Sequence, residues 1–253
     1  MMRVHKKNGR AGHVMGVVLL LCVLMATPVY GNSANSKKAN YNEGYEVILN
    51  EIYNTLSALG ENEVQIVVPD LFASDAEIEA FAKYVYQVYD LTGRVKVQKS
   101  TVSSQDGKKY KALLQFDNPC EVYEEQKAAE QILIDFAAGL EGLSDYDKVI
   151  LINDWLSEAS YDYTLQGKSC YANLVEKAST CNGFARAFYG ACSYAGVDCE
   201  NVRGWVGDTY HMWNRVLVDG SWKYVDVTWN SMAGENKWLL ITREEMNQDR
   251  REA

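Results

Sequence analysis

The chain has 253 residues, of which 34 are acidic and 25 basic, and it contains six Cys and three His. An apolar fraction of 47% and an aromatic fraction of 11% exclude an intrinsically disordered chain. The length allows one large domain or two small ones.

Residues 1–31 have the pattern of a secretory signal peptide. Four basic residues and no acidic one accompany an apolar run over 14–25. This run is shorter than the roughly 20 apolar residues of a membrane-spanning helix. Val29 and Gly31 supply small residues before a cleavage site. The alternative of a lipid-bearing Cys22 is disfavoured, because large Leu residues precede it where small ones are needed.

Cleavage after Gly31 would leave 222 residues, with 21 basic against 34 acidic side chains and a net charge of −13. Nucleic acids and anionic membranes both require a basic surface, so neither is expected as a partner. His211 would be the remaining histidine, which excludes a multi-histidine metal site. We expect a secreted or cell-envelope protein with no integral membrane span in the mature chain.

After a flexible segment at 32–42, residues 43–118 are predicted to form a small α/β domain. An apolar stripe predicts a helix over 43–59, and an apolar run predicts a strand at 64–68 that ends at Pro69-Asp70. A capping box at Ser74 opens a helix that ends near Gly93. Two alternating strands, 94–102 and 109–116, flank a turn over 105–107.

A second domain is predicted over 119–253, after Asn118-Pro119. Its first half is helical, with helices over 121–138, from Ser144 to Ala159, and from about Cys181 to Gly196. Strands are expected over 200–206, 210–218 and 221–228. All six Trp lie at or after Trp155. This skew supports a separate domain at the C-terminal end.

Cys181 is expected in the first turn of a largely buried helix, after Ser179 or Thr180 as the N-cap. The unsatisfied amides and the dipole at a helix start favour a thiolate, which is the reactive form of a cysteine nucleophile. The alternative is a small buried residue or half of a disulfide. Cleavage would leave five Cys, an odd number, so Cys181 is the natural unpaired one if the others form bridges. Their connectivity stays open among Cys120, Cys170, Cys192 and Cys199, with Cys192–Cys199 slightly favoured.

Asp219-Gly220 predicts a two-residue hairpin in which Val218 pairs with Ser221. That register places His211 opposite Thr228 and Trp213 opposite Asp226, all on one face. His211 and Asp226 would then be diagonal neighbours, about 7–8 Å apart at the backbone and within reach of a hydrogen bond. The alternatives are a salt bridge between Asp226 and Arg215, and a satisfied polar role for His211.

Three motifs resemble the transglutaminase-like superfamily in its bacterial exported branch. They are Cys181-x-Gly183-x-Ala185, His211-Met212-Trp213-Asn214-x-Val216, and Trp222-x-x-Val225-Asp226-x-Thr228-Trp229. The resemblance covers about 120–250. It implies an α+β, papain-like fold, in which a Cys-bearing helix packs on an antiparallel sheet.

By the same resemblance, Cys181 would be the nucleophile, His211 the general base and acid, and Asp226 the orienting carboxylate. Tyr161, Tyr163 and Trp213 are candidates for oxyanion stabilisation or substrate binding, beside the Cys181 amide. One departure is the absence of Gly in residues 177–180, just before the nucleophile.

The sequence thus predicts an exported thiol enzyme that carries out acyl transfer or hydrolysis at amide bonds of extracellular or cell-wall proteins or peptides. Neither a metal nor an organic cofactor is implied. The alternative is a non-catalytic cell-envelope binding or scaffold module that retains the same fold.

Overall fold

This computed structural model describes residues 3–6, 15–17, 49, 52, 56, 64–72, 74–86, 92–104, 107–116, 118–163 and 169–253. The chain divides into two compact units, of which the first comprises 1–31, 41–90 and 94–125 and the second 32–40, 91–93 and 126–253, so the main boundary lies between Glu125 and Gln126. Both residues lie inside one helix, α3 (Pro119–Ala138). The domain limits predicted from the sequence, at 31, 42 and 118, stay predictions.

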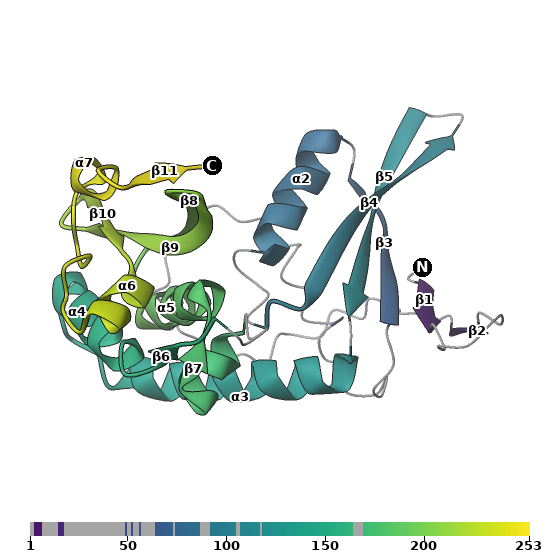
Figure 1. The fold of residues 1–253 in the computed structure, drawn as a ribbon. Coiled ribbons are helices and arrows are strands. Elements are labelled where there is room, and N and C mark those ends of the chain that lie inside the picture. Colours follow the sequence, from purple (N-terminus) through teal and green to yellow (C-terminus); the bar gives the residue numbers. More distant parts are fainter. Residues whose placement is uncertain are drawn as a thin grey trace. The chain divides into compact units, whose positions relative to one another are not determined.

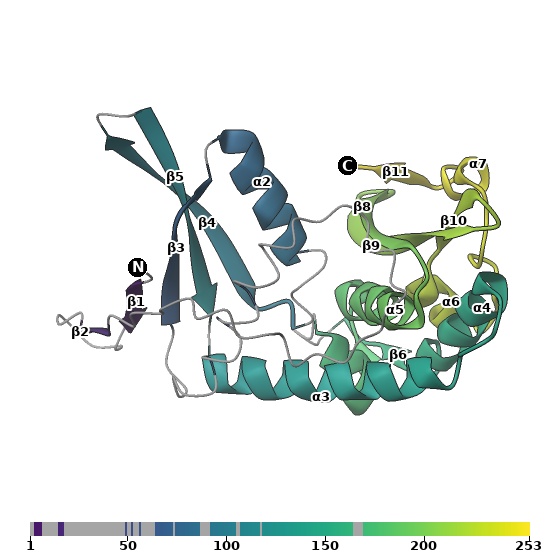
Figure 2. The same cartoon turned by 180° about the vertical axis from the view of Figure 1, so that it is seen from behind.

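The first unit contains an antiparallel sheet in the order β2-β1-β3-β5-β4. Helix α2 lies along this sheet and contacts β3 and β5 (Figures 1 and 2). Their apolar side chains form one core with Leu49, Ile52 and Leu56, the described residues of the helix predicted over 43–59. The elements are β1 (Arg3–Lys6), β2 (Met15–Val17), β3 (Val64–Phe72), α2 (Asp75–Tyr84), β4 (Val95–Ser104) and β5 (Gly107–Phe116).

Strands β1 and β2 belong to the segment predicted to be a signal peptide. β1 pairs with β3, and β2 pairs with β1. The rest of that segment, including Gly31, and the linker over 32–42 lie outside the described residues. Removal of 1–31 would leave β3 as an edge of the sheet.

The boundaries of two predicted elements differ in the structure. β3 continues through Pro69 to Phe72 and does not stop at Pro69, because a register shift between Val68 and Phe72 accommodates it. Proline lacks the N–H that a regular ladder requires, so an irregularity is expected there. Helix α2 begins as predicted, with the Ser74 side chain accepting from the Glu77 amide, but it ends at Tyr84 and does not reach Gly93. Residues 87–91 lie outside the described part.

The hairpin predicted around Gln105-Asp106-Gly107 is present, since β4 pairs with β5 from Val95 opposite Phe116 to Ser104 opposite Gly107. Gln105 and Asp106 themselves lie outside the described residues.

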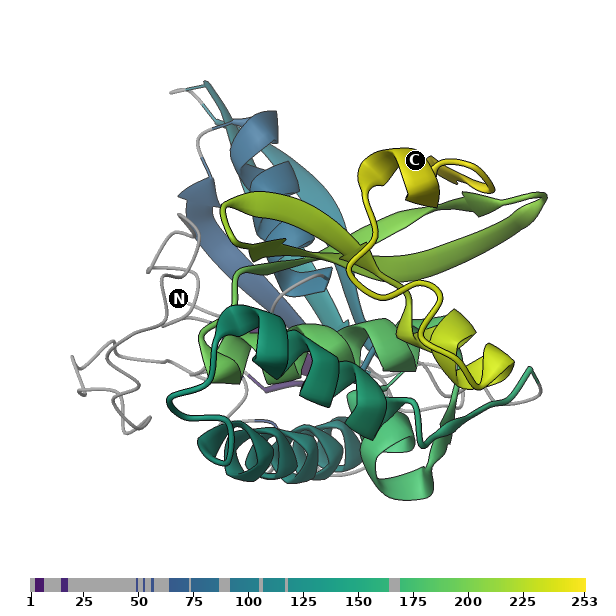
Figure 3. The same cartoon turned by 90° about the vertical axis from the view of Figure 1, so that its left-hand side faces the viewer.

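The second unit packs helices against an antiparallel sheet in the order β10-β9-β8-β11. In Figure 3 these strands lie above a layer of helices, of which α5 contacts β8 and β9. The predicted α+β, papain-like arrangement of a Cys-bearing helix on an antiparallel sheet is confirmed. Its elements are α4 (Asp145–Leu156), β6 (Ser160–Tyr161), a π-helical turn (Ala172–Glu176), β7 (Ala178–Ser179), α5 (Cys181–Ala195), β8 (Cys199–Val206), β9 (Thr209–Val218), β10 (Ser221–Val225), α6 (Val227–Ala233), α7 (Arg243–Met246) and β11 (Arg250–Glu252).

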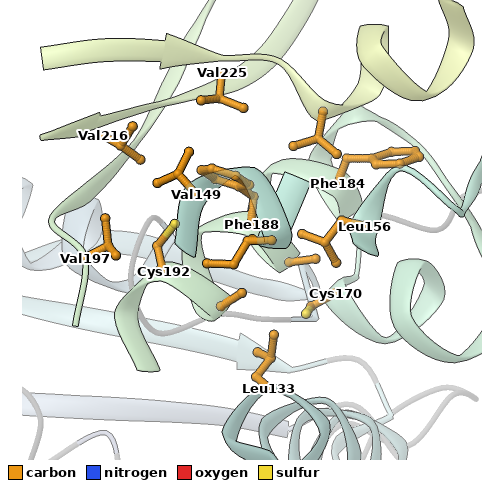
Figure 4. Packing of buried hydrophobic residues seen from close by; sticks show 14 of the residues in the cluster. Leu133, Val149, Leu156, Cys170, Phe184, Phe188, Cys192, Val197, Val216 and Val225 are labelled. Atoms are coloured by element: carbon orange, nitrogen blue, oxygen red, sulfur yellow. The ribbon is translucent and has the colours of Figure 1, made fainter. Parts of the chain in front are cut away.

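The core of this unit lies between the sheet and the helices (Figure 4). Phe184 and Phe188 of α5 are fully buried and pack with Val216 of β9 and Val225 of β10. Leu133 of α3 closes the other side. Because α5 is buried on most sides, its first residue is held rigidly against the rest of the unit. Within the described ranges, no helix is both long and apolar enough to cross a membrane.

Candidate active site

Cys181 is the first residue of α5, and its side chain is buried, with 7% exposure. Thr180 occupies the N-cap with extended backbone, and its side chain makes no capping bond to the first turn of the helix. Two residues later, a Cβ on Gly183 would lie 2.7 Å from the Ser169 carbonyl and from Ser179 Cβ. Gly183 is therefore required for the close packing of α5 against Ser169 and Ser179.

The thiol lies in a small apolar cluster with Ala185 of α5 and Met212 of β9, against which Tyr161 packs. The Asn182 side-chain amide lies 3.8 Å from Sγ of Cys181. Met212 is the residue next to His211, so this cluster brings the start of α5 to the start of β9.

The β9–β10 hairpin has the predicted register, with Val218 opposite Ser221 and Asn214 opposite Val225. Asp219 and Gly220 have φ values of 51° and 73°, as a type I′ turn requires. The turn sequence therefore determines which residues of β9 and β10 share a face.

The prediction that β10 continues to Thr228 is wrong. β10 ends at Val225, Asp226 is the N-cap of α6, and Thr228 lies inside that helix. The Asp226 side chain accepts from the Trp229 amide, and its own amide donates to the Trp238 carbonyl. These bonds replace the ladder that would have paired Asp226 with Trp213.

His211 and Asp226 nevertheless contact each other. Asp226 directly follows β10 as the N-cap of α6, and its carboxylate reaches the face of the sheet on which the His211 ring lies. Nε2 of His211 lies 2.8 Å from Oδ2 of Asp226. The two side chains are 6% and 0% exposed. The His211 ring stacks on Trp213 and meets Trp229 edge-on. The imidazole is thus fixed by a carboxylate on one nitrogen and by aromatic rings around it.

The His211 imidazole also interacts with the Cys181 thiol. Burial lowers the pKa of His211, but hydrogen bonds and charges from Asp226 and Cys181 outweigh it and raise the pKa to about 9. Because Asp226 occupies Nε2, the nitrogen left for Cys181 is Nδ1. A thiol, an imidazole and a carboxylate in series can move a proton from sulfur to the ring.

Arg250 of β11 is a further partner of Asp226, and no pattern in the sequence predicted this contact. Its Nη2 lies 2.9 Å from Oδ2 of Asp226, and both side chains are fully buried. Arg250 lies in a run of charged residues, Asp249-Arg250-Arg251-Glu252, that reads as solvent-exposed. No local sequence feature distinguishes it from the exposed Arg251. The alternative partner, Arg215, binds Glu200 at 2.6 Å instead.

The three other candidate site residues lie in different surroundings. Tyr161 is half-buried, and burial with the charges of Cys181, Tyr163 and Asp226 raises its pKa to about 12. Tyr163 is 76% exposed and meets Tyr161 edge-on, with ring centroids 4.5 Å apart. Trp213 is 1% exposed and lies beneath the His211 ring, so it does not line an open groove. Their predicted roles in oxyanion or substrate binding stay predictions.

The five cysteines of the described region, Cys120, Cys170, Cys181, Cys192 and Cys199, are all free thiols. The bridges expected among four of them are therefore not formed. Cys192 and Cys199, the favoured pair, contact each other, and burial together with the hydrogen bond between the two thiols raises the pKa of the Cys199 thiol. Within the described region, no group of three or more His, Cys, Asp or Glu could hold a metal ion.

Comparison with known proteins points to one family. Residues 134–227 match the family model described as the transglutaminase-like superfamily. A mouse protein named Kyphoscoliosis peptidase is 30% identical over 110 residues, which cover 36% of this chain and 17% of the mouse protein. The human protein of the same name is 30% identical over 140 residues, 47% of this chain and 21% of the human protein. The chain thus spans about a fifth of the length of these curated relatives.

Among solved structures, the periplasmic domain of TgpA from Pseudomonas aeruginosa is similar, with a TM-score of 0.37 and 12% identity. The similarity covers 68% of this chain and 71% of that domain.

Proposed function

We propose that the chain is an exported thiol enzyme that acts on amide bonds of proteins or peptides, because residues 134–227 match the family model of the transglutaminase-like superfamily. Cys181 is the nucleophile, His211 the general base and acid, and Asp226 the carboxylate that orients the imidazole. The observation that carries this proposal is the buried hydrogen bond of 2.8 Å between His211 and Asp226. The imidazole of His211 also interacts with Cys181.

In the proposed reaction, His211 takes the proton of the Cys181 thiol, and Sγ attacks the carbonyl carbon of an amide. The imidazolium then protonates the nitrogen of the leaving ammonia or amine, and a thioester remains on Cys181. Water gives hydrolysis of this thioester, whereas a second amine gives transfer. The Cys181 amide at the start of α5 would stabilise the oxyanion together with one further donor, for which Tyr161, Tyr163 and Trp213 are the candidates.

Export through the segment 1–31 and a substrate in the extracellular space or the cell wall are parts of the same proposal. The acidic charge of the chain supports a protein or peptide substrate over nucleic acid. The name of the mammalian relatives, Kyphoscoliosis peptidase, is consistent with hydrolysis of peptide bonds. The chain covers a small part of those proteins, so transfer and deamidation remain outcomes of the test.

The test compares wild type with Cys181→Ala on peptides that contain Gln, with and without an added primary amine. Cys120→Ala, which removes a half-buried thiol of α3, is the matched control. We expect product with wild type and the control, and none with Cys181→Ala. Ammonia release, amine incorporation and chain cleavage, each followed by mass spectrometry, separate deamidase, transferase and peptidase. Equal turnover by the wild type and Cys181→Ala would refute the proposal.

A second candidate function is a non-catalytic binding module. Its support is the exposed pair Trp205 and Tyr210, cross-strand partners on β8 and β9 with ring centroids 5.2 Å apart. Their exposed fractions are 38% and 51%. An intact His211–Asp226 bond beside a free thiol favours the enzyme. Absence of Cys181-dependent chemistry together with binding to cell-wall peptides would favour the module.

A further inference from the structure

Arg250 reaches the candidate site from β11, a short strand that is held firmly at the edge of the sheet. β11 pairs with β8, from Arg250 opposite Val206 to Glu252 opposite Gly204. The Tyr224 hydroxyl donates to the Glu252 carboxylate at 2.7 Å. The direction of the Arg250 side chain is therefore set by the backbone of β11 and does not depend on a flexible terminus.

The Arg250 guanidinium is fully buried and lies near two indole rings. Its Cζ lies 4.6 Å from the ring centroid of Trp229 and 5.6 Å from that of Trp238. Nη2 donates to Oδ2 of Asp226, and Nη1 binds the half-exposed carboxylate of Asp249. Burial of a charge is costly unless the charge is paired, so this arrangement ties Arg250 to Asp226.

His211 and Arg250 bind the same atom, Oδ2 of Asp226, at 2.8 and 2.9 Å. One carboxylate oxygen thus serves two donors, one of which is a permanent cation. The Arg250 charge opposes a second positive charge on the nearby imidazole, whereas the Asp226 charge favours it.

We propose that Arg250 is a positioning residue of this site, which shares Oδ2 of Asp226 with His211 and so limits how strongly the carboxylate holds a proton on the imidazole. The consequence of this arrangement for catalysis rests on the proposed function. An imidazole that holds its proton too tightly is a poor acid toward the leaving amine. The geometric claim itself concerns only Arg250, Asp226 and His211.

The charged and titratable groups around His211 come from four elements. Cys181 of α5 and Asp226 at the start of α6 contact the ring, and Tyr161 of β6 interacts with both of them. Arg250 of β11 acts through Asp226, and Asp249 partly neutralises Arg250. Changes at Arg250 and at Asp249 should therefore shift the His211 titration in opposite directions.

The test is an NMR titration of the His211 ring in the full chain, with His211→Gln used to assign the resonance among the three histidines. Arg250→Gln removes the cation but keeps a polar side chain, and we expect it to raise the pKa of His211 by about one unit above the wild-type value. Asp249→Asn frees Arg250 from its second carboxylate, and we expect a smaller shift to lower pH. Arg250→Lys keeps the charge and should stay near wild type.

Arg251→Gln is the matched control, because Arg251 lies on the same strand with an exposed side chain. It should leave the His211 titration unchanged. An unchanged or lowered pKa of His211 in folded Arg250→Gln would overturn the proposal. If Arg250→Gln does not fold, the test is made with Asp249→Asn. A pKa of His211 that is not lowered in Asp249→Asn would then overturn the proposal.

This readout does not depend on turnover. A wild type without amide chemistry would refute the proposed function, yet the His211 shifts would still establish the role of Arg250. Conversely, an active enzyme in which neither variant moves the His211 titration keeps the function and loses the inference. In an active enzyme, the alkaline limb of the kcat/KM profile should move with the NMR value in each variant.

Discussion

His211 and Asp226 meet where strand β10 passes into helix α6. Oδ2 of Asp226 lies 2.8 Å from Nε2 of His211, and Oδ1 of the same carboxylate accepts from the Trp229 amide in the first turn of α6. One side chain therefore caps a helix and orients an imidazole. This double role makes Asp226 the residue at which stability and the proposed chemistry are most closely coupled.

Asp226→Asn should separate the two roles. Asparagine is also a good N-cap, so α6 should keep its capping bond. The charge is lost, so the His211 ring loses its carboxylate partner and the buried Arg250 guanidinium keeps only its ion pair with the half-exposed Asp249. We expect a loss of 10²–10⁴-fold in activity, roughly the contribution of a positioned acid–base group, and a destabilisation of about 3–5 kcal/mol. Turnover and urea unfolding measure the two effects.

Asp208→Asn, in the exposed turn between β8 and β9, is the control for the charge change. It should alter neither activity nor unfolding. Full activity of Asp226→Asn would contradict an orienting role for the carboxylate.

The free energy of unfolding should depend on pH through His211. The pKa of its ring is raised from 6.5 to about 9 in the folded protein, so protonation stabilises the fold. That contribution is fully present below about pH 6.5 and is lost as the pH rises through about 9. Its size is on the order of 3 kcal/mol.

The measurement is the difference in unfolding free energy between wild type and His211→Gln, followed from pH 6 to pH 10. This difference should fall with rising pH. A difference that stays constant over the range, or grows with pH, would mean that His211 is not stabilised in its charged form.

The five described thiols should differ in their reactivity in the folded protein. Cys181 lies at the start of α5 and interacts with the His211 imidazole, which can accept the proton of the thiol as it reacts. Cys170 is fully buried, and burial raises the pKa of its thiol, so the thiolate is disfavoured. We expect iodoacetamide to label Cys181 first, and faster than a model thiol near neutral pH.

Peptide mapping by mass spectrometry after short labelling times gives the order directly. Cys170 and Cys192, both with 0% exposure, should be labelled only after unfolding. His211→Gln should slow the labelling of Cys181 and leave the other thiols unchanged. Labelling of Cys170 before Cys181 would be incompatible with the arrangement described here.

Gly204→Ala should loosen the strand that carries Arg250. A Cβ at this position would lie 2.2 Å from the Arg251 carbonyl and 2.7 Å from a ring carbon of Trp213. Either β11 or the Trp213 ring must move, at a cost of about 1–3 kcal/mol. Thermal unfolding should show this loss.

Gly139→Ala is the matched control, because its Cβ would come no closer than 3.3 Å to its nearest neighbour, the Phe136 carbonyl. Its effect should be smaller than that of Gly204→Ala. Equal unfolding temperatures for Gly204→Ala and the wild type would show that β11 does not pack tightly on Gly204.

Local features of the sequence determined much of the second unit. Thr180 and Gly196 bound helix α5 and so place Cys181 in its first turn. Asp219-Gly220 fixes the hairpin register, because few residues other than Gly, Asn and Asp adopt positive φ without strain. These patterns need only neighbouring residues, so they place Cys181 and align β9 with β10. The roles of the thiol, the imidazole and the carboxylate were implied by the resemblance of three motifs to the transglutaminase-like superfamily.

The tertiary structure decided how the carboxylate is held and what surrounds it. The end of β10 depends on the bonds of Asp226 and Tyr224 to Trp238 and Ile241, which are more than ten residues away. The partnership of Asp226 with Arg250 spans 24 residues. A run of charged residues carries no local sign that one member is buried, since burial depends on where β11 pairs and on the two indole rings that cover it. Sequence patterns report on neighbours along the chain, and this ion pair is made by neighbours in space.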